Sequence, residues 1–590
     1  MRLADFIFES LADYGVDKIF MVTGRGALFL TDAVAKSKRI QAVCVHHEQA
    51  AAYAATARAQ LHNSLGVCLV STGCASTNAL TGVLSAYQDG LPVLFISGQN
   101  VLKETTYYTG HNLRTYGQQE ANIVEIVKPI TKYAVMVTDP LDIKRQLQEA
   151  LHFANEGKKG PVWIDIPLDL QSAQIEPGNL LGFALEAQEV QASNADIAYL
   201  KDALSVAKRP VLLIGSGVRS ANVLEKFSTF TDANQIPVVV TPSSVDCYPL
   251  SRPLSVGSLG SMGCSRAGAF AVQNADCVVV LGNRLSSITT GVDFCKFARN
   301  AKLIVVDIDE DEHKKYDLNI DRIIVQDLKF LFDRLGSARL TGSTVDWVQK
   351  CQHWKALFEH EPHFASNSRI DLYHLSKALS SQLADDAIVI TDSGLIEVIL
   401  PSNLDFGIQR RAIHPISQGA MGFSIPAVLG VADAGRQTVV VVGDGSFMMN
   451  MQELETIRAH KIPLKLIVVN NNVYSIIRRR QKELFRNRTI GTDPGNGVTV
   501  PSFEKVANLF DFEFLRINSP ETLEAGLKQV LNSEGPVLCE IMGKEDQEYI
   551  EISHAKNSTG KFVRRPLEDQ WPFLERNVFL SEMVIDPIDQ

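Results

Sequence analysis

Residues 438–471 read TVVVVGDGSFMMNMQELETIRAHKIPLKLIVVNN. Two apolar runs in this stretch end in polar residues, the first in Gly-Asp-Gly at 443–445 and the second in paired asparagines at 470–471. Short, continuous apolar runs are typical of buried strands in a parallel sheet. The segment between the runs predicts a helix over 446–460. The stretch therefore predicts a strand, a helix and a second strand parallel to the first.

The ends of these two predicted strands carry oxygen ligands. A right-handed crossover places the carboxyl ends of consecutive parallel strands at the same edge of a sheet, so Asn471 is expected within reach of Asp444. A carboxylate, an amide oxygen and a backbone carbonyl, for which Val473 is the candidate, suit Mg²⁺. The remaining positions around such an ion would be open to phosphate oxygens and water.

The turn between the first strand and the helix has the composition of a phosphate-binding loop. Gly443 and Gly445 permit a tight turn and close approach of the backbone, and Ser446 would open a helix whose free amides face a phosphate. The alternative for the Gly-Asp-Gly motif alone is a turn followed by a helix cap. The chain contains no GxxxxGK[ST] motif, so a Walker A site is excluded.

Runs of the same kind recur along the whole chain in three sets, near residues 15–170, 205–330 and 385–545. Alternation of such strands with helical patterns predicts an α/β fold of three doubly wound parallel-sheet domains. The predicted strands are KIFMV (18–22), SLGVCLVS (64–71), LPVLFIS (91–97), GPVWIDI (160–166), RPVLLIG (209–215), IPVVVT (236–241), CVVVLG (277–282), KLIVVDID (302–309), AIVITD (387–392), TVVVVGDG (438–445), LKLIVVNN (464–471) and GPVLCEI (535–541).

Polar, strand-poor stretches at 171–196 and 349–371 separate the three sets and are interpreted as linkers. The predicted domains are 1–175, 195–340 and 368–545. A tail from 546 to 590, rich in charge and proline, is expected to lack strands and to wrap around the body.

Composition argues against nucleic-acid-binding and membrane-spanning proteins. The 590 residues carry a formal net charge of −10, so no global positive field favours nucleic acid as a partner. No run approaches the ~18 apolar residues of a membrane span. The N-terminal 20 residues predict an amphipathic helix rather than a signal peptide. The nine cysteines form no CxxC pair and are expected to be reduced core thiols in a cytoplasmic protein.

Several motifs together resemble the acetolactate synthase-like thiamine diphosphate enzymes over nearly the whole chain. The resemblance implies thiamine diphosphate and Mg²⁺ as cofactors, with N-terminal pyrimidine-binding, central and diphosphate-binding domains. It also implies a homodimer or homotetramer in which each active site lies between two chains. The matching stretches are HHEQAAAYAATARA (46–59), SLGVCLVSTGCASTNALTGVLSAYQDGLPVLFISGQ (64–99), GPVWIDIP (160–167), SQGAMGFSIPA (417–427) and the strand ends at 443–445 and 470–471.

Glu48 precedes a helix of small residues and matches the family glutamate that bonds N1′ of the cofactor's aminopyrimidine. The alternative is an acid in the first turn of a helix, where it compensates the helix dipole. His46 and His47 with Glu48 could suggest a metal cluster, but adjacent residues on a strand or helix do not all face one ion. Gln99 and Gln119 match positions near the cofactor and substrate.

Two residues of the GAMGF motif match the family's cofactor supports. Met421 corresponds to the apolar residue between the two cofactor rings, and Gly419 to the residue whose carbonyl accepts from the 4′-amino group. Met421 on its own could equally fill a core helix.

The resemblance implies decarboxylation of a 2-oxo acid such as pyruvate and transfer of the acyl-anion unit to a second carbonyl. Arg480 stands where acetolactate synthases have the tryptophan that selects the acceptor, and Arg25 and Gly26 form part of the family's glycine-containing loop. Arg478, Arg479 and Arg480 could clamp an anionic acceptor, or they could form a solvated helix face. Other stretches resemble a branch of the family from surface-polysaccharide pathways, which suggests a nucleotide-activated keto sugar as the acceptor.

Two other functions remain open: 2-oxo-acid decarboxylation without ligation, and a non-catalytic regulatory homologue. FAD binding in the central domain is open as well. Arg284 matches a flavin-contacting residue, but Ser286 and Ser287 replace a family Asp pair and Met262 replaces a His.

Overall fold

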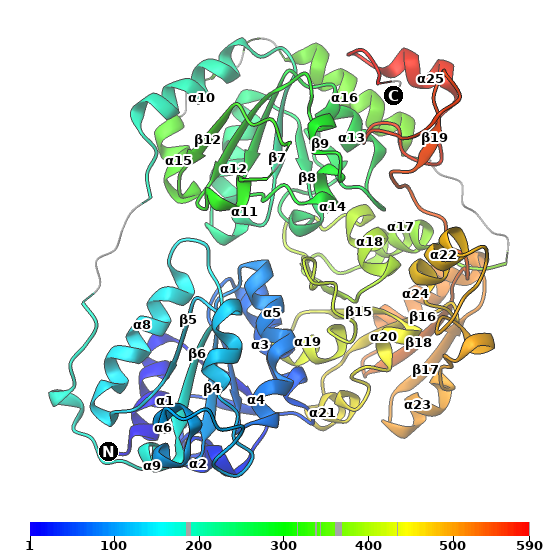
Figure 1. Ribbon diagram of the computed structural model, residues 1–590. Helices are drawn as coiled ribbons and strands as arrows, with labels where there is room; N and C mark the ends of the chain where they lie inside the picture. The colour runs from blue at the N-terminus through cyan, green and yellow to red at the C-terminus, as the bar shows by residue number, and fades with distance from the viewer. Residues whose placement is uncertain are drawn as a thin grey trace.

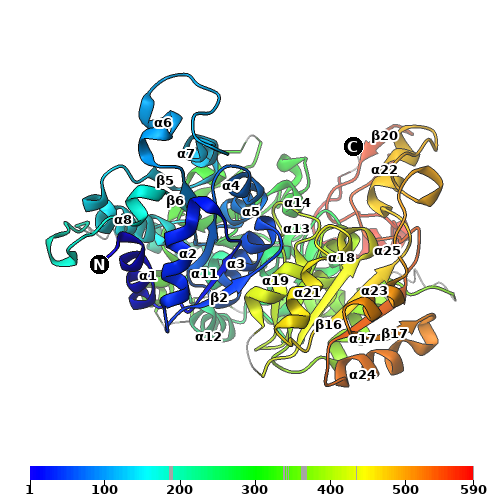
Figure 2. The same ribbon diagram turned by 90° about the horizontal axis from the view of Figure 1, so that it is seen from below.

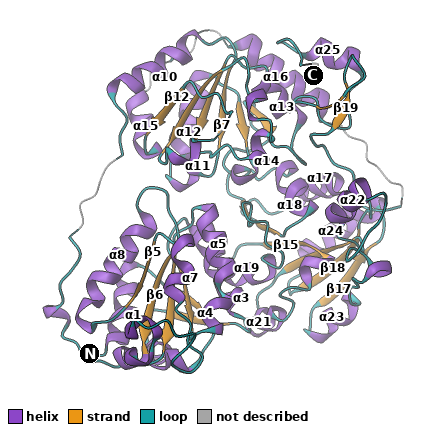
Figure 3. Ribbon diagram, in the orientation of Figure 1, coloured by secondary structure: helices purple, strands orange, loops and turns teal. Residues whose placement is uncertain are grey.

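The computed structural model describes residues 1–184, 190–315, 317–336, 339–340, 342, 344–359, 368–432 and 435–588. These residues form three six-stranded parallel sheets flanked by helices (Figures 1 and 3). The first sheet lies at the lower left of Figure 1, the second at the top and the third at the lower right. The predicted fold class is confirmed.

The first sheet has the strand order β2-β1-β3-β4-β6-β5. Its strands are β1 (Lys18–Met21), β2 (Gln41–Cys44), β3 (Gly66–Val70), β4 (Val93–Gln99), β5 (Tyr133–Met136) and β6 (Val162–Pro167). Its helices are α1 (Leu3–Tyr14), α2 (Leu28–Lys36), α3 (Glu48–His62), α4 (Cys74–Asn78), α5 (Leu80–Asp89), α6 (Thr106–Thr109), α7 (Ile123–Val127), α8 (Ile143–Asn155) and α9 (Leu168–Gln171).

The third sheet repeats that topology, with the order β14-β13-β15-β16-β18-β17. Its strands are β13 (Ile388–Thr391), β14 (Arg411–Ile413), β15 (Thr438–Gly443), β16 (Lys465–Asn470), β17 (Glu513–Ile517) and β18 (Val537–Met542). Its helices are α17 (Leu372–Gln382), α18 (Leu395–Asn403), α19 (Ser424–Val431), α20 (Asp444–Phe447), α21 (Glu453–Ala459), α22 (Ser475–Leu484), α23 (Phe503–Leu509) and α24 (Leu523–Asn532).

The central sheet has a different order, β12-β11-β10-β7-β8-β9, which is the 3-2-1-4-5-6 arrangement of dinucleotide-binding folds. Its strands are β7 (Pro210–Ile214), β8 (Val238–Val240), β9 (Ser255–Ser258), β10 (Cys277–Leu281), β11 (Lys302–Asp307) and β12 (Arg322–Val325). Its helices are α10 (Asn194–Val206), α11 (Gly217–Ser220), α12 (Leu224–Asn234), α13 (Arg266–Gln273), α14 (Ser287–Thr290), α15 (Leu328–Leu335) and α16 (Val345–Phe358).

All twelve predicted strands are present, and they are the four interior strands of each sheet. The strands that were not predicted are the two edge strands of each sheet: β2, β5, β9, β12, β14 and β17. Interior strands are buried on both faces, and their sequences are therefore continuous apolar runs. In β15, for example, five consecutive residues are buried. Most edge strands are mixed; β17, for example, exposes Glu513 and Arg516.

Three local expectations need correction: the helix over 446–460, the strand-free tail and the second linker. The helix predicted over 446–460 is two helices, α20 and α21, with turns at 448–452 between them, so Ser446 lies inside α20 rather than opening a helix. The tail is not strand-free, because β19 (His554–Lys556) and β20 (Phe562–Arg564) form a short antiparallel hairpin before α25 (Arg576–Glu582).

The predicted linkers include residues 185–189 and 360–367, which lie outside the described residues. The second linker stretch also includes most of α16, whose Trp347 Nε1 donates to the Pro210 carbonyl at 3.0 Å. That helix therefore packs on the central sheet. The tail packs on the central domain too, where the buried Arg266 donates to the carbonyls of Gln570 and Pro572.

Helix α3 and helix α19 join the first and third domains. Small residues on α3 allow very close packing, since a Cβ on Gly430 of α19 would overlap the Ala54 carbonyl. Tyr53 and Phe423 meet edge to face with ring centroids 5.3 Å apart. The close approach fixes the start of α3, where Glu48 lies, beside the third domain.

Helix α1 confirms the predicted amphipathic N-terminal helix, and its Leu3, Ile7 and Leu11 are buried. Among the described residues, no helix is both long enough and apolar enough to cross a membrane.

Candidate active site

The Gly-Asp-Gly turn and the asparagine run lie side by side. Strands β15 and β16 pair in parallel up to Gly443 and Val469, so the residues after them share one edge of the sheet. Asp444 Oδ1 accepts from the Gly445 amide at 2.7 Å, and Oδ2 accepts from the Asn472 amide at 2.6 Å. The two strand ends therefore meet as the crossover predicted. Burial raises the pKa of Asp444 to about 6.

The oxygen donors at this edge suit a hard divalent cation. Asn471 Nδ2 donates to Ser475 Oγ at 2.6 Å, which leaves its Oδ1 on the other side, 3.3 Å from the Val473 amide. A carboxylate, an amide oxygen and the Val473 carbonyl are the donor types that Mg²⁺ prefers. The donor chemistry therefore fits the cation that was predicted from the sequence.

The turn itself differs from the predicted phosphate loop. Helix α20 has only four residues, and the Gly445 amide is already used by the Asp444 carboxylate. Gly445 nevertheless needs to be glycine, because a Cβ there would overlap the ring of Tyr474. Gly443 is different: a Cβ would have only Ile396 Cδ1 near it, at 3.7 Å, so space remains beside its backbone.

The turn with Gly419 and Met421 is held by Asp392, at the end of β13. The Asp392 carboxylate is buried and accepts from the Gly422 amide at 2.9 Å and from the Ser424 amide and hydroxyl at 2.8 and 2.7 Å. Gly419 has φ of +59°. Met421, in the same turn, is half-buried.

A second buried acid, Glu397 in α18, lies against the same turn. A Cβ on Gly419 would lie 3.7 Å from Glu397 Oε2. Glu397 is 5% exposed, and its Oε1 has no hydrogen-bond partner among the described residues. Burial, together with the nearby Asp392 and Asp89, raises the pKa of Glu397 well above its usual value. This acid is therefore uncompensated within the described chain.

Glu48 begins α3 and is half-buried, with its Oε2 accepting from Asn78 Nδ2 at 2.9 Å. The neighbouring histidines are engaged elsewhere: the His46 amide donates to Glu453 Oε1 at 3.0 Å, and His47 Nδ1 accepts from the Gln49 amide at 3.1 Å. The described residues contain no cluster of three or more His, Cys, Asp or Glu side chains suited to a metal. The His46 ring lies 3.1 Å from Thr456 Oγ1 through its Nδ1, so both histidine rings make local polar contacts.

Gln99, Gln119 and the Arg25–Gly26 turn gather at the corresponding edge of the first sheet. Gln99 is 1% exposed, and its Nε2 donates to Asp165 Oδ2 at 3.1 Å and to the Ala121 carbonyl at 3.0 Å. Gln119 is exposed in a left-handed conformation, with φ of +60°. The guanidinium of Arg25 is exposed and donates to Gln118, while Gly26 is buried beneath it.

Glu48 and the Asp444–Asn471 pair make no direct polar contact. In the part of the chain that the structure describes, no hydrogen bond or ion pair joins them. The start of α3 does contact the third domain, because Asn450 Nδ2 donates to Gln49 Oε1 at 3.1 Å.

The three arginines of α22 do not form one anion clamp. Arg478 is buried and paired with acids, as described below, and Arg479 contacts Glu551 and lies over the rings of Tyr549 and Trp571. Arg480 has 48% of its side chain exposed and pairs loosely with Glu483 at 3.2 Å and Glu551 at 3.4 Å. Only Arg480 presents an accessible guanidinium.

A cavity of about 280 Å³ lies at the carboxyl ends of the central strands, where β7 and β10 are neighbours. In open α/β sheets this reversal of strand order is the usual ligand crevice. Glycine lets the two turns touch, since a Cβ on Gly217 would lie 2.6 Å from Gly282 Cα. Arg284 lines the cavity and donates to Ser417 Oγ at 3.1 Å. The lining also includes Lys158, Lys159, Asp307 and Asp327.

Sequence reasoning missed Asp392, Glu397 and Asn450, which support the Gly419 turn. Asp392 carried a signal, because it ends an apolar strand run as Asp444 does. Glu397 and Asn450 carried none, since their roles arise only from packing between separate segments. Asn450 Nδ2 donates to the Gly422 carbonyl at 2.9 Å from the turn between α20 and α21.

Comparison with known proteins identifies the same three units. The N-terminal thiamine pyrophosphate-binding domain model matches residues 1–126, the central domain model of the same enzymes 197–335, and their C-terminal thiamine pyrophosphate-binding domain model 392–541. An acetolactate synthase large subunit of Lactococcus lactis is 30% identical over 91% of this chain and 92% of its own. One of Parasynechococcus marenigrum is 31% identical over 91% and 86%, and the isozyme 2 large subunit of Escherichia coli 29% over 99% of both chains.

Proposed function

The chain belongs to the thiamine pyrophosphate enzymes, with acetolactate synthase large subunits among its relatives, and from this premise we propose that it is a Mg²⁺-dependent carboligase. It would decarboxylate a 2-oxo acid, with pyruvate as the candidate, and transfer the acyl-anion unit to a second carbonyl. The observation that carries the proposal is the meeting of Asp444 with the 471–473 segment inside the region matched by the C-terminal model.

In this proposal Asp444, Asn471 and the Val473 carbonyl hold Mg²⁺, which in turn holds the diphosphate. The open space beside Gly443 supports close approach of the diphosphate. Bound thiamine diphosphate would supply the electron sink that lets a 2-oxo acid lose CO₂. The protein supplies position and exclusion of water.

Glu48 would hold a proton at N1′ of the aminopyrimidine. Asp392 fixes the turn on which the Gly419 carbonyl would accept from the 4′-amino group, and Met421 would pack against the cofactor. Gln99 and Gln119 would border the substrate, Gln99 through the loop that it holds at Ala121.

The first test is binding and turnover. Purified protein should bind thiamine diphosphate only with Mg²⁺ and should consume pyruvate, and Glu48→Gln should lower turnover by about 100-fold while keeping Mg²⁺ binding. A product with a new carbon–carbon bond supports the carboligase. Free aldehyde as the sole product would establish a non-ligating decarboxylase, and binding without turnover would establish a non-catalytic homologue.

We propose further that two chains complete each active site, in a homodimer or homotetramer. The resemblance of the sequence to enzymes that build each active site between two chains supports this arrangement. Mixing inactive Glu48→Gln with inactive Asp444→Asn subunits tests it, because a site shared between chains would regain one intact copy per mixed dimer. Mixtures that stay inactive after subunit exchange would contradict it.

For the acceptor we propose a nucleotide-activated keto sugar, with Arg480 contacting its anionic part. The support is the accessible guanidinium of Arg480, whose neighbours Arg478 and Arg479 are occupied. Carboligation of pyruvate should then require the keto sugar and weaken in Arg480→Met. Efficient turnover with 2-oxo acids alone would rule this acceptor out.

For the central cavity we propose FAD in a structural role. The 3-2-1-4-5-6 strand order and the touching glycine turns support a phosphate-bearing dinucleotide, and Lys158, Lys159 and Arg284 supply cations in a lining that also carries acids. Purified protein should show flavin absorbance, and Arg284→Ala should reduce it. A colourless protein that does not take up added FAD would contradict this assignment.

We place the protein in the cytoplasm. All nine cysteines are unpaired, and six of them are buried, which supports a reducing compartment.

A further inference from the structure

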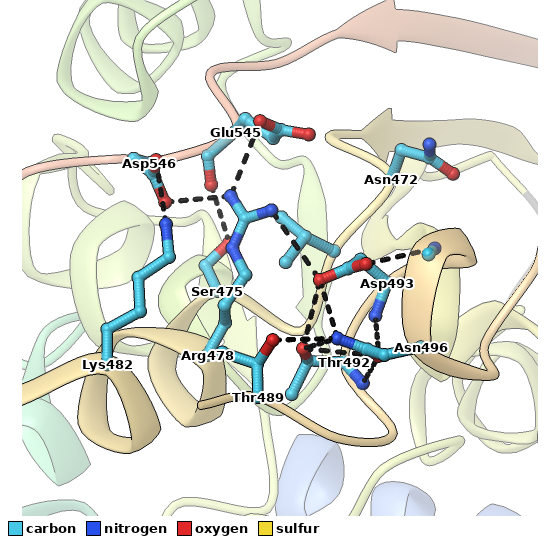
Figure 4. Close-up of polar contacts among 12 residues, drawn as sticks. Asn472, Ser475, Arg478, Lys482, Thr489, Thr492, Asp493, Asn496, Glu545 and Asp546 are labelled. Atoms are coloured by element: carbon cyan, nitrogen blue, oxygen red, sulfur yellow. Dashed lines mark hydrogen bonds and ion pairs between the residues drawn. The ribbon is translucent and has the colours of Figure 1, made fainter. Parts of the chain in front are cut away.

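Helix α22 starts directly after the predicted cation site. It contacts the 489–498 loop, the Glu545–Asp546 segment and Glu551. Tyr474, at its N-cap, Arg478 and Gln481 follow the i, i+4, i+7 spacing of one helix face. This face holds residues 489–498, a loop around the short 3₁₀ turn at Pro494–Asn496. Figure 4 shows this loop lying beneath Arg478.

Arg478 is the hub of these contacts. It is 6% exposed, and its Nη2 donates to Asp546 Oδ1 at 2.7 Å. The same nitrogen lies 3.4 Å from Glu545 Oε2, and Nη1 lies 3.9 Å from Asp493 Oδ2 (Figure 4). One guanidinium thus bridges the loop on one side and the segment after β18 on the other.

The loop is held together around that contact by its own hydrogen bonds. Asn496 Oδ1 accepts from the Thr492 amide at 2.7 Å and from the Asp493 amide at 2.9 Å, and Asn496 Nδ2 donates to Thr489 Oγ1 at 3.0 Å. Gln481 on α22 pairs in both directions with the backbone of Ile490. The loop is therefore one unit attached to α22 at Arg478 and Gln481.

The same loop reaches the cation site through Tyr474. The Tyr474 amide donates to the Thr492 carbonyl at 2.8 Å, and the Tyr474 ring covers Gly445, next to Asp444. On the other side, Ser475 Oγ accepts from Asn471 and lies 3.3 Å from the Glu545 carbonyl. Both segments that Arg478 holds thus touch residues adjoining the predicted ligands.

We propose that Arg478 is a positioning residue for the predicted Mg²⁺ site. By holding the 489–498 loop and the Glu545–Asp546 segment on α22, it keeps Asn471 and Val473 aligned with Asp444. The inference rests on the proposed function, because it assigns a support to that same site. Arg478 touches neither substrate nor the predicted ion.

Arginine is needed for geometric reasons. Its planar guanidinium can face two directions at once, whereas a lysine ammonium is a single point charge. Removal of Arg478 would take away the cation that faces Asp493, whose side chain is 19% exposed. The loop would then keep only its contacts with Tyr474 and Gln481 on α22.

The test compares Arg478→Met with Lys482→Met. Lys482 lies one turn further along α22, is more exposed and is 3.5 Å from Asp546 Oδ2 (Figure 4). Among the described residues its side chain has no hydrogen bond or ion pair to the 489–498 loop, so it is a matched control that shares only one side of the bridge. Mg²⁺ affinity would be measured by calorimetry in saturating thiamine diphosphate. Loss of a residue that orients metal ligands typically costs 10–100-fold in affinity, so Arg478→Met should weaken Mg²⁺ by at least about 10-fold. Arg478→Lys should recover part of that loss, and Lys482→Met should match wild type.

Hydrogen exchange gives an independent readout. Amides of residues 489–498 should exchange faster in Arg478→Met than in wild type, with and without the cofactors, while amides of β15 and β16 stay protected. A structural defect spread through the third domain would instead raise exchange in the strands as well, and would overturn a specific positioning role.

The outcomes separate the two proposals. If wild type binds neither Mg²⁺ nor thiamine diphosphate, the proposed function fails and this inference falls with it. If wild type binds both and Arg478→Met binds Mg²⁺ equally well, only this inference is overturned. Should Arg478→Met not fold, Asn496→Ala loosens the loop from within, and wild-type Mg²⁺ affinity in that variant would overturn the inference in the same way.

Discussion

The first and third sheets share one topology but differ at their carboxyl edges. Strands β3 and β4 occupy the places in the first sheet that β15 and β16 occupy in the third. Both pairs end in small polar residues: Ser-Thr-Gly (71–73) and Gln-Asn (99–100) in the first sheet, Gly-Asp-Gly (443–445) and Asn-Asn-Asn (470–472) in the third. Sequence pattern and topology alone would assign a similar site to both edges.

The edge of the first sheet is closed by its own chain. Ser71 Oγ accepts from the Gly26 amide at 3.1 Å, and Thr72 Oγ1 donates to the Gly98 carbonyl at 3.1 Å. Gln171 Nε2 donates to the Gly26 carbonyl at 2.6 Å and fixes that turn from the far side. The turn at 24–27 thus occupies the place where a ligand could approach the strand ends.

The edge of the third sheet is not closed in this way. Among the described residues, Asp444 accepts hydrogen bonds from backbone amides only, and only Ile396 Cδ1 lies near the position of a Cβ on Gly443. Figure 2 shows the two sheets as separate bodies with α3 and α19 between them. The shared topology thus brings polar groups to both edges, but the loop over each edge determines how much space remains for a ligand.

The largest expected effect comes from exchanging the key side chain at each edge. Asp444→Asn should weaken Mg²⁺-dependent binding of thiamine diphosphate by at least about 100-fold, because an amide offers one oxygen and no charge to the cation. Thr72→Ser, at the closed edge, keeps its hydroxyl and should bind like wild type. Calorimetric titration measures both variants. Equal loss in the two would contradict the difference between the edges.

The sequence predicted the interior of the fold better than its margins. All four interior strands of each sheet lie between two neighbours and have a largely apolar centre, such as VVVV at 439–442. Edge strands such as RIIV at 322–325 or EFLRI at 513–517 have one paired side and mixed burial, so their pattern is weaker. Strand β9 is buried, but its SVGS composition lacks the bulky residues typical of strands.

The site was predictable where it follows from strand ends. Asp444 and Asn471 were found because each ends an apolar run, and the crossover rule brought them together. Support of the Gly419 turn by Glu397 and Asn450 was not predictable, because those residues meet the turn only after three segments pack. The division of α20 from α21 was hidden as well, since FMMNMQ at 447–452 has ordinary helical composition.

Closure of the first sheet's edge by the Gly26 turn can be tested by substitution. A Cβ on Gly98 would overlap the backbone of Gly26, which cannot rotate away, so Gly98→Ala should cost about 2 kcal/mol of folding free energy. A Cβ on Gly443 would meet only the end of the Ile396 side chain, so Gly443→Ala should barely change stability while weakening cofactor binding. Thermal denaturation without cofactor checks the first effect and calorimetry the second. A stable Gly98→Ala variant would show that the first edge is not tightly closed.

The first and third domains also differ in how their buried acids are paired. Asp165 lies in the first sheet. Its Oδ1 accepts from Ser97 Oγ at 2.6 Å and its Oδ2 from Gln99 Nε2, while Ser97 Oγ also accepts from Trp163 Nε1 at 2.8 Å. Ser97 Oγ and Gln99 Nε2 therefore both need an acceptor oxygen at residue 165, and an Asn side chain has only one. Asp165→Asn should destabilise the protein by about 1–2 kcal/mol in denaturant titrations. An unchanged midpoint would mean that the network rearranges without loss.

Glu397 of the third domain is the opposite case, and Glu397→Gln should have a small effect at pH 5 that grows as pH rises. Its charged neighbours, Asp392 and Asp89, are acids, and burial raises the pKa of Asp89 to about 6. Because the pKa of Glu397 in the folded state lies above its unfolded value near 4.5, its contribution to stability is complete below pH 4.5 and declines as pH rises through the folded-state pKa. Gln does not titrate, so wild type should become progressively less stable relative to Glu397→Gln above pH 4.5. At pH 5 the difference should be below about 1 kcal/mol, since the slope for one proton is at most about 1.4 kcal/mol per pH unit. Melting temperatures of the two proteins from pH 4 to 8, without cofactor, would measure the divergence. Parallel curves would mean that Glu397 is ionised in the folded state and has a partner, which would remove the contrast with Asp165.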